Sequence, residues 1–257
     1  MTTGLLLLHA FPLDADMWDP QVEALSSRLP VVAVNLPGFG GAAMAPGEPA
    51  GWMDRAADVA DAALGGTGID RVVVCGLSMG GYVAFAYWRR HRERVAGLIL
   101  ANTRSGADDD AGKQRRRDLA TRLRAEGNGF LADSPPPLLS EGAPAELLDR
   151  VKAMIRRQPA EAIAAASLAM AERPDSTPDL AKVEVPTLVI TSSGDRLIPA
   201  DASKPTAEQV KGAQLEVIDG AGHLSNLEAP EEFNRAVAAH LARCGVEGAG
   251  TGSRGHG

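Results

Sequence analysis

Short runs of aliphatic residues alternate along this chain with longer amphipathic segments. The runs are rich in Val, Ile and Leu, which predicts β-strands. Because they are almost continuously apolar, they suit strands that are buried on both faces of a parallel sheet. The strands are expected at Leu5–His9, Val31–Asn35, Val72–Cys75, Leu98–Ala101, Thr187–Thr191 and Leu215–Asp219.

Helical periodicity follows most of these runs. Helices are expected near Pro20–Arg28, Asp54–Ala63, Met79–Arg90 and Glu231–Ala242. Strands that alternate with helices predict an α/β fold with a doubly wound, mostly parallel sheet.

Residues 104–182 interrupt the alternation between the fourth and fifth strands. Helices are expected there at Arg115–Glu126, Ala145–Arg157 and Glu161–Glu172, with a break at Ser134-Pro135-Pro136-Pro137. We therefore expect a core made of residues 1–103 and 183–246, and a helical insert at 104–182. Residues 247–257 are rich in Gly and Ser and are expected to be a disordered tail.

The clearest chemical signal is Gly76-Leu77-Ser78-Met79-Gly80, which lies between an expected strand and an expected helix. This G-x-S-x-G pattern in this context is typical of a nucleophile elbow, a sharp turn that presents a serine above the end of a strand. The turn strains the backbone at Ser78 and leaves room only for small neighbours, which Gly76 and Gly80 supply. Cys75, just before the turn, is expected to be a buried small apolar side chain instead of a nucleophile.

Two later strands each end in a candidate partner for Ser78. Asp195 follows the fifth expected strand and His223 follows the sixth. Since the carboxyl ends of parallel strands meet at one edge of a sheet, the three side chains are expected to meet there as nucleophile, acid and base. Asp201 and Asp219 are the alternative acids, although Asp219 is more suited to closing the loop before His223. Two further histidines, His91 and His240, fall on or near helices and are expected to be solvated or at an edge.

Composition narrows the class of protein. The chain has 257 residues and a formal net charge of −7 with both signs interspersed, which argues against nucleic acid as a main partner. Cys75 and Cys244 do not suggest a disulfide framework, and no histidine and cysteine spacing suggests a metal site. Leu5–Leu8 is too short for a signal peptide, and no run approaches the length of a membrane span. We expect a soluble, cytoplasmic protein without a cofactor.

Five matching segments give the chain a family resemblance. They are Leu8–Pro12, Leu36–Gly40, the elbow, Gly194-Asp195 with Ile198-Pro199, and Gly222-His223 with Glu228–Glu231. Over about residues 5–103 and 183–243 the chain resembles the α/β-hydrolase superfamily, and in particular small serine esterases and lactonases such as 3-oxoadipate enol-lactonases and cofactor-free haloperoxidase-like esterases. Residues 104–182 carry no motif that matches.

The resemblance also bears on the sheet. Family members usually begin with a β-hairpin that this sequence lacks, so we expect about six strands, all parallel, with Val31–Asn35 at an edge. An apolar exposed edge is a liability. A dimer contact or an incomplete N-terminus would account for it, so either a monomer or a homodimer is expected.

The resemblance implies an oxyanion hole and a cap. The backbone N–H groups of Phe11 and Met79 are expected to form the hole, and His9 is expected to orient the loop that carries Phe11. The insert at 104–182 is expected to cover the pocket as a cap. Candidate pocket residues are Phe130, Leu131, Met154, Leu168, Met170 and Leu224. The basic cluster Lys113–Arg117 could recognise an anionic substrate or an acyl-carrier partner, but a solvated helix face is favoured.

These observations predict a serine hydrolase that cleaves a small carboxylic ester or lactone through an acyl-enzyme intermediate. Three alternatives remain open. They are a thioesterase acting on acyl-CoA or acyl-carrier substrates, a C–C bond hydrolase or biosynthetic cyclase with the same triad, and a non-catalytic small-molecule receptor. Haloalkane dehalogenases and epoxide hydrolases are disfavoured, because they need an aspartate where this chain has Ser78.

Overall fold

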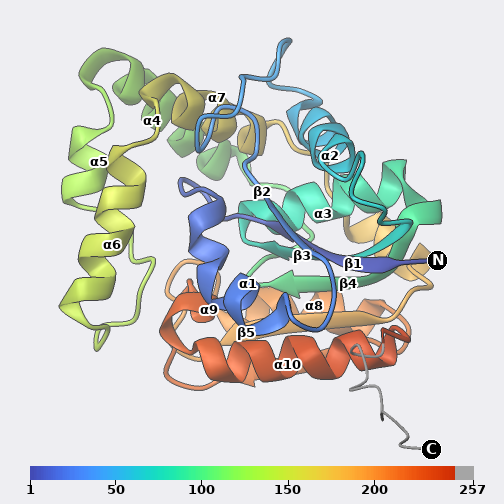
Figure 1. Ribbon diagram of the computed structural model, residues 1–257. Helices are drawn as coiled ribbons and strands as arrows, with labels where there is room; N and C mark the ends of the chain where they lie inside the picture. Colours follow the sequence, from blue (N-terminus) through green and yellow to red (C-terminus); the bar gives the residue numbers. More distant parts are fainter. Residues whose placement is uncertain (247–257) are drawn as a thin grey trace, which may run out of the picture.

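Six parallel strands form one sheet in the computed structural model, which describes residues 1–246 (Figure 1). The order across the sheet is β2-β1-β3-β4-β5-β6, so β2 lies at an edge as predicted. The strands are β1 (Thr3–Leu8), β2 (Val31–Val34), β3 (Arg71–Leu77), β4 (Val95–Ala101), β5 (Thr187–Ser192) and β6 (Gln214–Ile218). All six predicted strands are confirmed, with boundaries that differ by at most a few residues. The predicted disordered tail, 247–257, lies outside the described residues.

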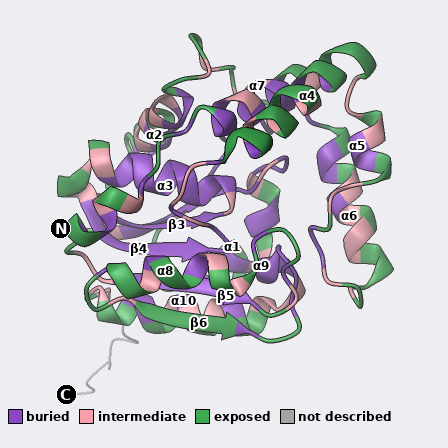
Figure 2. Ribbon diagram, turned by 180° about the vertical axis from the view of Figure 1, so that it is seen from behind, coloured by how far each residue is buried: buried purple, intermediate pink, exposed green. Residues whose placement is uncertain are grey.

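Helices cover both faces of the sheet, which confirms the doubly wound α/β fold. Figures 1 and 2 show α1 (Asp19–Leu25) and α10 (Pro230–Arg243) on one face, and α2 (Trp52–Ala62), α3 (Met79–Arg90) and α8 (Ala200–Gln209) on the other. The central strands are buried between them, and β1, β3 and β4 form much of the apolar core. Shorter helical segments are η1 (Ala15–Trp18), η2 (Arg92–Arg94), η3 (Thr177–Lys182) and α9 (Ser225–Glu228).

Helix α8, which the sequence analysis did not predict, contains Pro205. A proline inside a helix removes one backbone hydrogen bond and clashes with the preceding turn, so it normally argues against a helix. Packing of α8 against β5 and η3 overrides that local penalty.

Four helices lie between β4 and β5, where the sequence predicts a helical insert. They are α4 (Asp110–Glu126), α5 (Gly129–Asp133), α6 (Ala145–Arg156) and α7 (Ala160–Ala171). Helix α4 packs along α7 and α5 packs against α6, so the segment consists of two helical pairs (Figure 1). Helix α4 begins five residues before the predicted start, because the Asp109 carboxylate caps it by accepting a hydrogen bond from the Gly112 N–H at 2.7 Å.

One helical histidine differs from its prediction. His240 on α10 is fully buried instead of solvated, and it lies near Gly97 of β4 and Cys244. Burial penalises the charged imidazolium and lowers the pKa of His240 to about 4. This neutral histidine therefore belongs to the part of the core on the face of the sheet opposite α3, the helix that follows Ser78. Among residues 1–246, no helix is both long enough and apolar enough to span a membrane.

Candidate active site

Ser78 stands on a strained turn between β3 and α3. Its backbone has φ 56° and ψ −114°, a conformation that is costly for a residue with a side chain. A Cβ atom on Gly76 would lie 2.1 Å from the Gly80 carbonyl oxygen, and one on Gly80 would lie 2.0 Å from the Leu8 carbonyl oxygen. Both glycines are thus required by close backbone contacts, and the elbow has the geometry that its sequence predicts.

Hydrogen bonds hold this turn against the strain. The Ser78 N–H donates to the Ala101 carbonyl at 2.9 Å, and the Ser78 carbonyl accepts from the Thr103 hydroxyl at 2.8 Å. By contrast, Cys75 is fully buried, and burial raises the pKa of its thiol. Of these two candidate nucleophiles, Ser78 lines the cavity and Cys75 does not.

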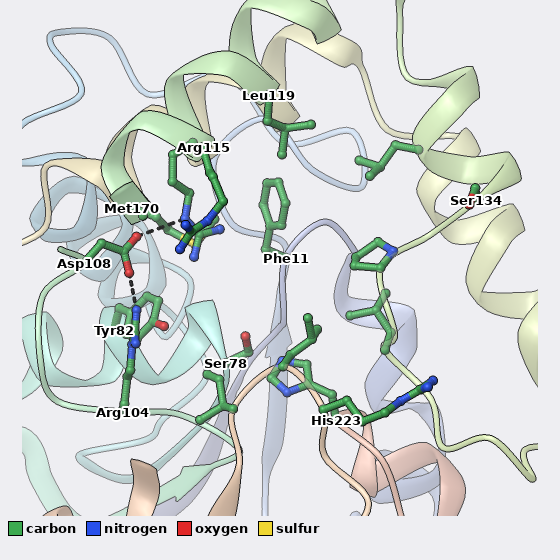
Figure 3. Close-up of a pocket in the computed structure, with 18 of the residues that line it drawn as sticks. Phe11, Ser78, Tyr82, Arg104, Asp108, Arg115, Leu119, Ser134, Met170 and His223 are labelled. Atoms are coloured by element: carbon green, nitrogen blue, oxygen red, sulfur yellow. Dashed lines mark hydrogen bonds and ion pairs between the residues drawn. The ribbon is translucent and has the colours of Figure 1, made fainter. Parts of the chain in front are cut away.

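His223 and Asp195 lie together beside Ser78. His223 Nδ1 is 2.8 Å from Asp195 Oδ2, and both side chains are buried. Ser78 and His223 both line one cavity, where Figure 3 shows them on neighbouring positions at its floor. The structure thus brings the three predicted residues to one edge of the sheet, with Nδ1 of the histidine directed at the carboxylate.

Four donors surround the Asp195 carboxylate. Besides His223, Oδ2 accepts a hydrogen bond from the Asn102 amide at 3.0 Å, while Oδ1 accepts from the N–H groups of Leu197 and Ile198 at 2.8 and 2.9 Å. Burial alone would raise the pKa of Asp195, but the hydrogen bonds and charge of His223 and the other donors hold it below its usual range. The carboxylate is therefore ionised and rigidly oriented.

The two alternative acids lie elsewhere. Asp201 is exposed and pairs with Lys204, and the Asp219 carboxylate accepts a hydrogen bond from Ser193 at 2.7 Å. Neither contacts His223 in this structure.

Three polar residues that the sequence did not single out support Asp195. Asn102 has a left-handed backbone, with φ 43°, and its amide bonds both Asp195 and Ser192. The Ser225 hydroxyl donates to the Asn102 side-chain oxygen at 2.6 Å. All three side chains are buried, and together they join the ends of β4 and β5 to α9. No spacing pattern reveals such a network, because its members come from three separate segments.

The loop after β1 brings Phe11 to the cavity. His9 orders this loop, since its Nε2 accepts the Leu36 N–H and its Nδ1 donates to the Ala10 carbonyl, each at 3.0 Å. Burial lowers the pKa of His9 to about 4, so the ring is neutral, as this pattern requires. Met79 is the first residue of α3, a position whose N–H has no acceptor within its own helix. The Met79 side chain is fully buried and does not form cavity wall.

Asp14 connects the same loop to the insert. Its buried carboxylate accepts hydrogen bonds from Arg157 Nε and Gln158 Nε2, each at 2.6 Å. Gln158 in turn accepts from the Gly40 N–H at 2.9 Å. The end of α6 is thereby fixed to the loops that follow β1 and β2.

The cavity above Ser78 has a volume of about 680 Å³. The sheet edge supplies Ser78 and His223, and the insert supplies most of the opposite wall (Figure 3). Of the predicted pocket residues, Phe130, Leu131 and Met170 line the cavity. Its apolar wall consists of Phe11, Leu119, Phe130, Leu131, Leu138, Met170, Leu197 and Ile198.

Three predicted pocket residues do not line this cavity. Leu168 precedes Met170 by two positions on α7, which is about 200° of helical rotation, so the two side chains point to opposite sides. Met154 is buried on α6, which packs against α5. Leu224 is fully buried beside His223, and its N–H donates to the Leu138 carbonyl. In each case the apolar side chain is used for packing.

Part of the predicted basic cluster lines the cavity. Arg115 and Arg116 line the cavity, whereas Arg117 lies outside it and pairs with Glu172. Arg115 and Arg117 are exposed, as the favoured interpretation of a solvated helix face predicts, whereas Arg116 is half-buried and pairs with Asp108. Within residues 1–246, no group of three or more His, Cys, Asp or Glu side chains is arranged to hold a metal ion.

Comparisons with known proteins agree with this geometry. Residues 5–236 match the Alpha/beta hydrolase family. Among curated relatives, 3-oxoadipate enol-lactonase 2 of Acinetobacter baylyi is 27% identical over 93% of this chain and 89% of its own length. The pimeloyl-[acyl-carrier protein] methyl ester esterase of Nitrosomonas europaea is 29% identical over 90% and 94%.

Solved structures of hydrolases are also similar to this chain. A thermophilic esterase from Thermogutta terrifontis, determined with malate bound, superposes with a TM-score of 0.89 at 39% identity, over 95% of this chain and 90% of that one. The enol-lactonase from Burkholderia xenovorans LB400 gives a TM-score of 0.83 at 26% identity, over 94% and 92%.

Proposed function

This chain belongs to the alpha/beta hydrolase family and is a hydrolase, and we propose that it cleaves a small carboxylic ester or lactone through an acyl-enzyme intermediate. The observation that carries the proposal is the 2.8 Å contact between His223 Nδ1 and Asp195, beside a serine on a strained elbow in the same cavity. Relatives named as esterases and enol-lactonases support an ester or lactone bond as the target.

The first half of the reaction forms the acyl-enzyme. His223 Nε2 takes the proton of the Ser78 hydroxyl as its oxygen attacks the substrate carbonyl carbon. Asp195 fixes the histidine tautomer and stabilises the imidazolium. The N–H groups of Phe11 and Met79 donate to the oxyanion, and the positive end of α3 adds to their field. The imidazolium then gives its proton to the leaving alkoxide, and the C–O bond of the ester breaks.

The second half releases the acid. A water molecule gives its proton to His223 Nε2 and attacks the acyl carbon, and collapse of the intermediate returns the proton to Ser78. For a lactone, the alkoxide remains attached to the acyl group, so one product is released. The helices α4–α7 act as the cap, since they supply Leu119, Phe130 and Met170 to the wall that faces the elbow.

Covalent labelling and turnover together test this function. A fluorophosphonate probe should label the wild type at Ser78, and the wild type should hydrolyse members of a panel of p-nitrophenyl esters, simple lactones and acyl thioesters. Ser78→Ala should lose labelling and about 10⁶-fold in kcat while its circular dichroism spectrum stays unchanged. Ser134→Ala, which removes another serine of the cavity wall, is the matched labelling control.

The panel also separates the alternatives. Hydrolysis of thioesters alone would indicate a thioesterase, and labelling without turnover of any panel member would favour the C–C hydrolase or cyclase. Binding without labelling would favour a receptor. Retention of more than a tenth of wild-type hydrolysis by Ser78→Ala would refute the assigned nucleophile.

A further inference from the structure

The wall of the cavity carries an excess of positive charge. Five arginines line it, at positions 104, 115, 116, 122 and 196, against a single carboxylate, Asp108. Asp108 is also shared, because it pairs with Arg104, with Arg116 at 3.2 Å and with the buried Arg173 at 2.9 Å. The single negative charge of Asp108 therefore cannot neutralise the three arginines that surround it.

Asp108 holds this arrangement in place. Burial alone would raise the pKa of Asp108, but the hydrogen bonds and charges of Arg173 and Arg116 hold it well below its usual range. Arg173 also lies over the ring of Tyr82, 4.1 Å from its centroid. The network is thus ionised and fixed at neutral pH, and its net charge is positive.

Arg115 differs from the other arginines of the wall. Arg122 pairs with Glu126 at 2.9 Å and Arg196 pairs with Glu141 at 2.8 Å. Within residues 1–246, the Arg115 guanidinium makes neither a hydrogen bond nor an ion pair, and Figure 3 shows its side chain extending from α4 toward the space beside Phe11. Its donors are therefore available to a ligand in the cavity.

The helical phase of α4 places this arginine on the cavity face. Gly112, Arg115, Leu119 and Arg122 recur at intervals of three and four residues, and all four line the cavity. Arg117 is two residues further on, about 200° around the helix, and it faces away to pair with Glu172.

We propose that Arg115, beside the Arg104–Asp108–Arg116 network, binds a carboxylate of the substrate, so that the enzyme prefers esters or lactones that carry a free carboxylate apart from the scissile bond. The proposal rests on the function proposed above and specifies its substrate class. A guanidinium donates two parallel hydrogen bonds to a carboxylate. Arg115 is exposed, so its guanidinium can be reached from the solvent side of the cavity.

A matched pair of substrates tests the preference. One is an aryl ester of a neutral alkanoic acid, and the other is the mono-aryl ester of a dicarboxylic acid with the same chain length. We expect the wild type to show the higher kcat/KM on the anionic ester, and the preference to weaken as salt is raised. Arg115→Gln should reduce the ratio of anionic to neutral kcat/KM by about tenfold or more, mainly through KM.

Arg117→Gln is the control, because it removes the same charge from the same helix outside the cavity and should leave the ratio unchanged. A second readout does not need turnover. A free dicarboxylate should protect Ser78 from fluorophosphonate labelling, and Arg115→Gln should weaken that protection by a similar factor.

The outcomes separate this proposal from the function on which it rests. Equal kcat/KM for the two esters in the wild type, or a ratio that Arg115→Gln does not change, would overturn the carboxylate site while esterase activity stands. A charge preference seen only with acyl-CoA thioesters would also overturn it, since the arginines would then bind phosphate. Absence of labelling and of hydrolysis of both esters would instead refute the proposed function.

Discussion

Replacing Asp195 by Asn tests the polar network behind His223. The Asp195 carboxylate accepts four hydrogen bonds, two at each oxygen. The amide of Asn can accept at only one of these positions. In one orientation its NH₂ group faces His223 and Asn102, and in the other it faces the N–H groups of Leu197 and Ile198. In either orientation the NH₂ group, itself a donor, faces two other donors, so two of the four hydrogen bonds are lost.

The number of lost hydrogen bonds gives a magnitude for the loss of stability in Asp195→Asn. Two hydrogen bonds to a charged acceptor disappear, and each is worth about 1.5–3 kcal/mol, so the free energy of unfolding should fall by about 3 kcal/mol or more. His223 can recover one bond by adopting the other tautomer, with Nδ1 accepting from the amide. That tautomer carries its proton on Nε2, where it cannot take the Ser78 proton, so kcat should fall by about 10⁴.

Urea unfolding and ester hydrolysis measure the two effects. Asp201→Asn is the matched control, since its carboxylate is exposed and, among residues 1–246, pairs only with Lys204. It should change neither quantity appreciably. If Asp195→Asn keeps more than a tenth of wild-type kcat, or if Asp201→Asn loses as much, then the orienting acid has been misassigned.

Two further predictions concern the elbow and the buried histidine. Gly80→Val places a Cβ atom 2.0 Å from the Leu8 carbonyl oxygen, so it should destabilise the fold by at least about 3 kcal/mol or prevent soluble expression. Gly142→Val, where a Cβ meets open space, is its control, and a soluble, active Gly80→Val protein would contradict the strained turn. His240 has its pKa lowered to about 4 in the fold from 6.5. The unfolded chain therefore binds more protons between these values, and stability is lost as pH falls from 6.5 toward 4. His240→Leu should reduce the slope of unfolding free energy against pH in that window by up to about 1.4 kcal/mol per pH unit. Urea unfolding from pH 4.5 to 7.5 measures this slope, and an unchanged slope would mean that the pKa of His240 is the same in the folded and unfolded chain.

The strands and the elbow could be predicted because local sequence determines them. A strand buried on both faces must be apolar throughout, and that run is visible without any tertiary information. The turn at Ser78 needs glycine where a Cβ would strike backbone, so Gly76 and Gly80 mark it directly. Asp195 and His223 were identifiable because each follows a strand, and parallel strands bring such positions to one edge.

The pocket wall could not be predicted in the same way, because it depends on how each insert helix is rotated. Met170 and Leu168 are both apolar residues near the end of α7, and only the packing of α7 against α4 decides that Met170 faces the cavity. Asn102 was missed for a related reason. Its partners Ser192 and Ser225 lie 90 and 123 residues away, and no local pattern links them.

The same dependence explains why Arg115 and Arg117 look alike in the sequence. Both lie in one basic run, and charge alone favours a solvated face for the whole run. What separates them is the rotation of α4 about its axis. Packing against α7 sets that rotation, and the hydrogen bond from the Ser167 hydroxyl to the Arg116 carbonyl joins the two helices at this point. A substitution that changed this rotation would move Arg115 away from its present place at the cavity wall. If Arg115 binds the substrate as proposed, the contact between α4 and α7 controls substrate preference, while the residues at the sheet edge stay the same.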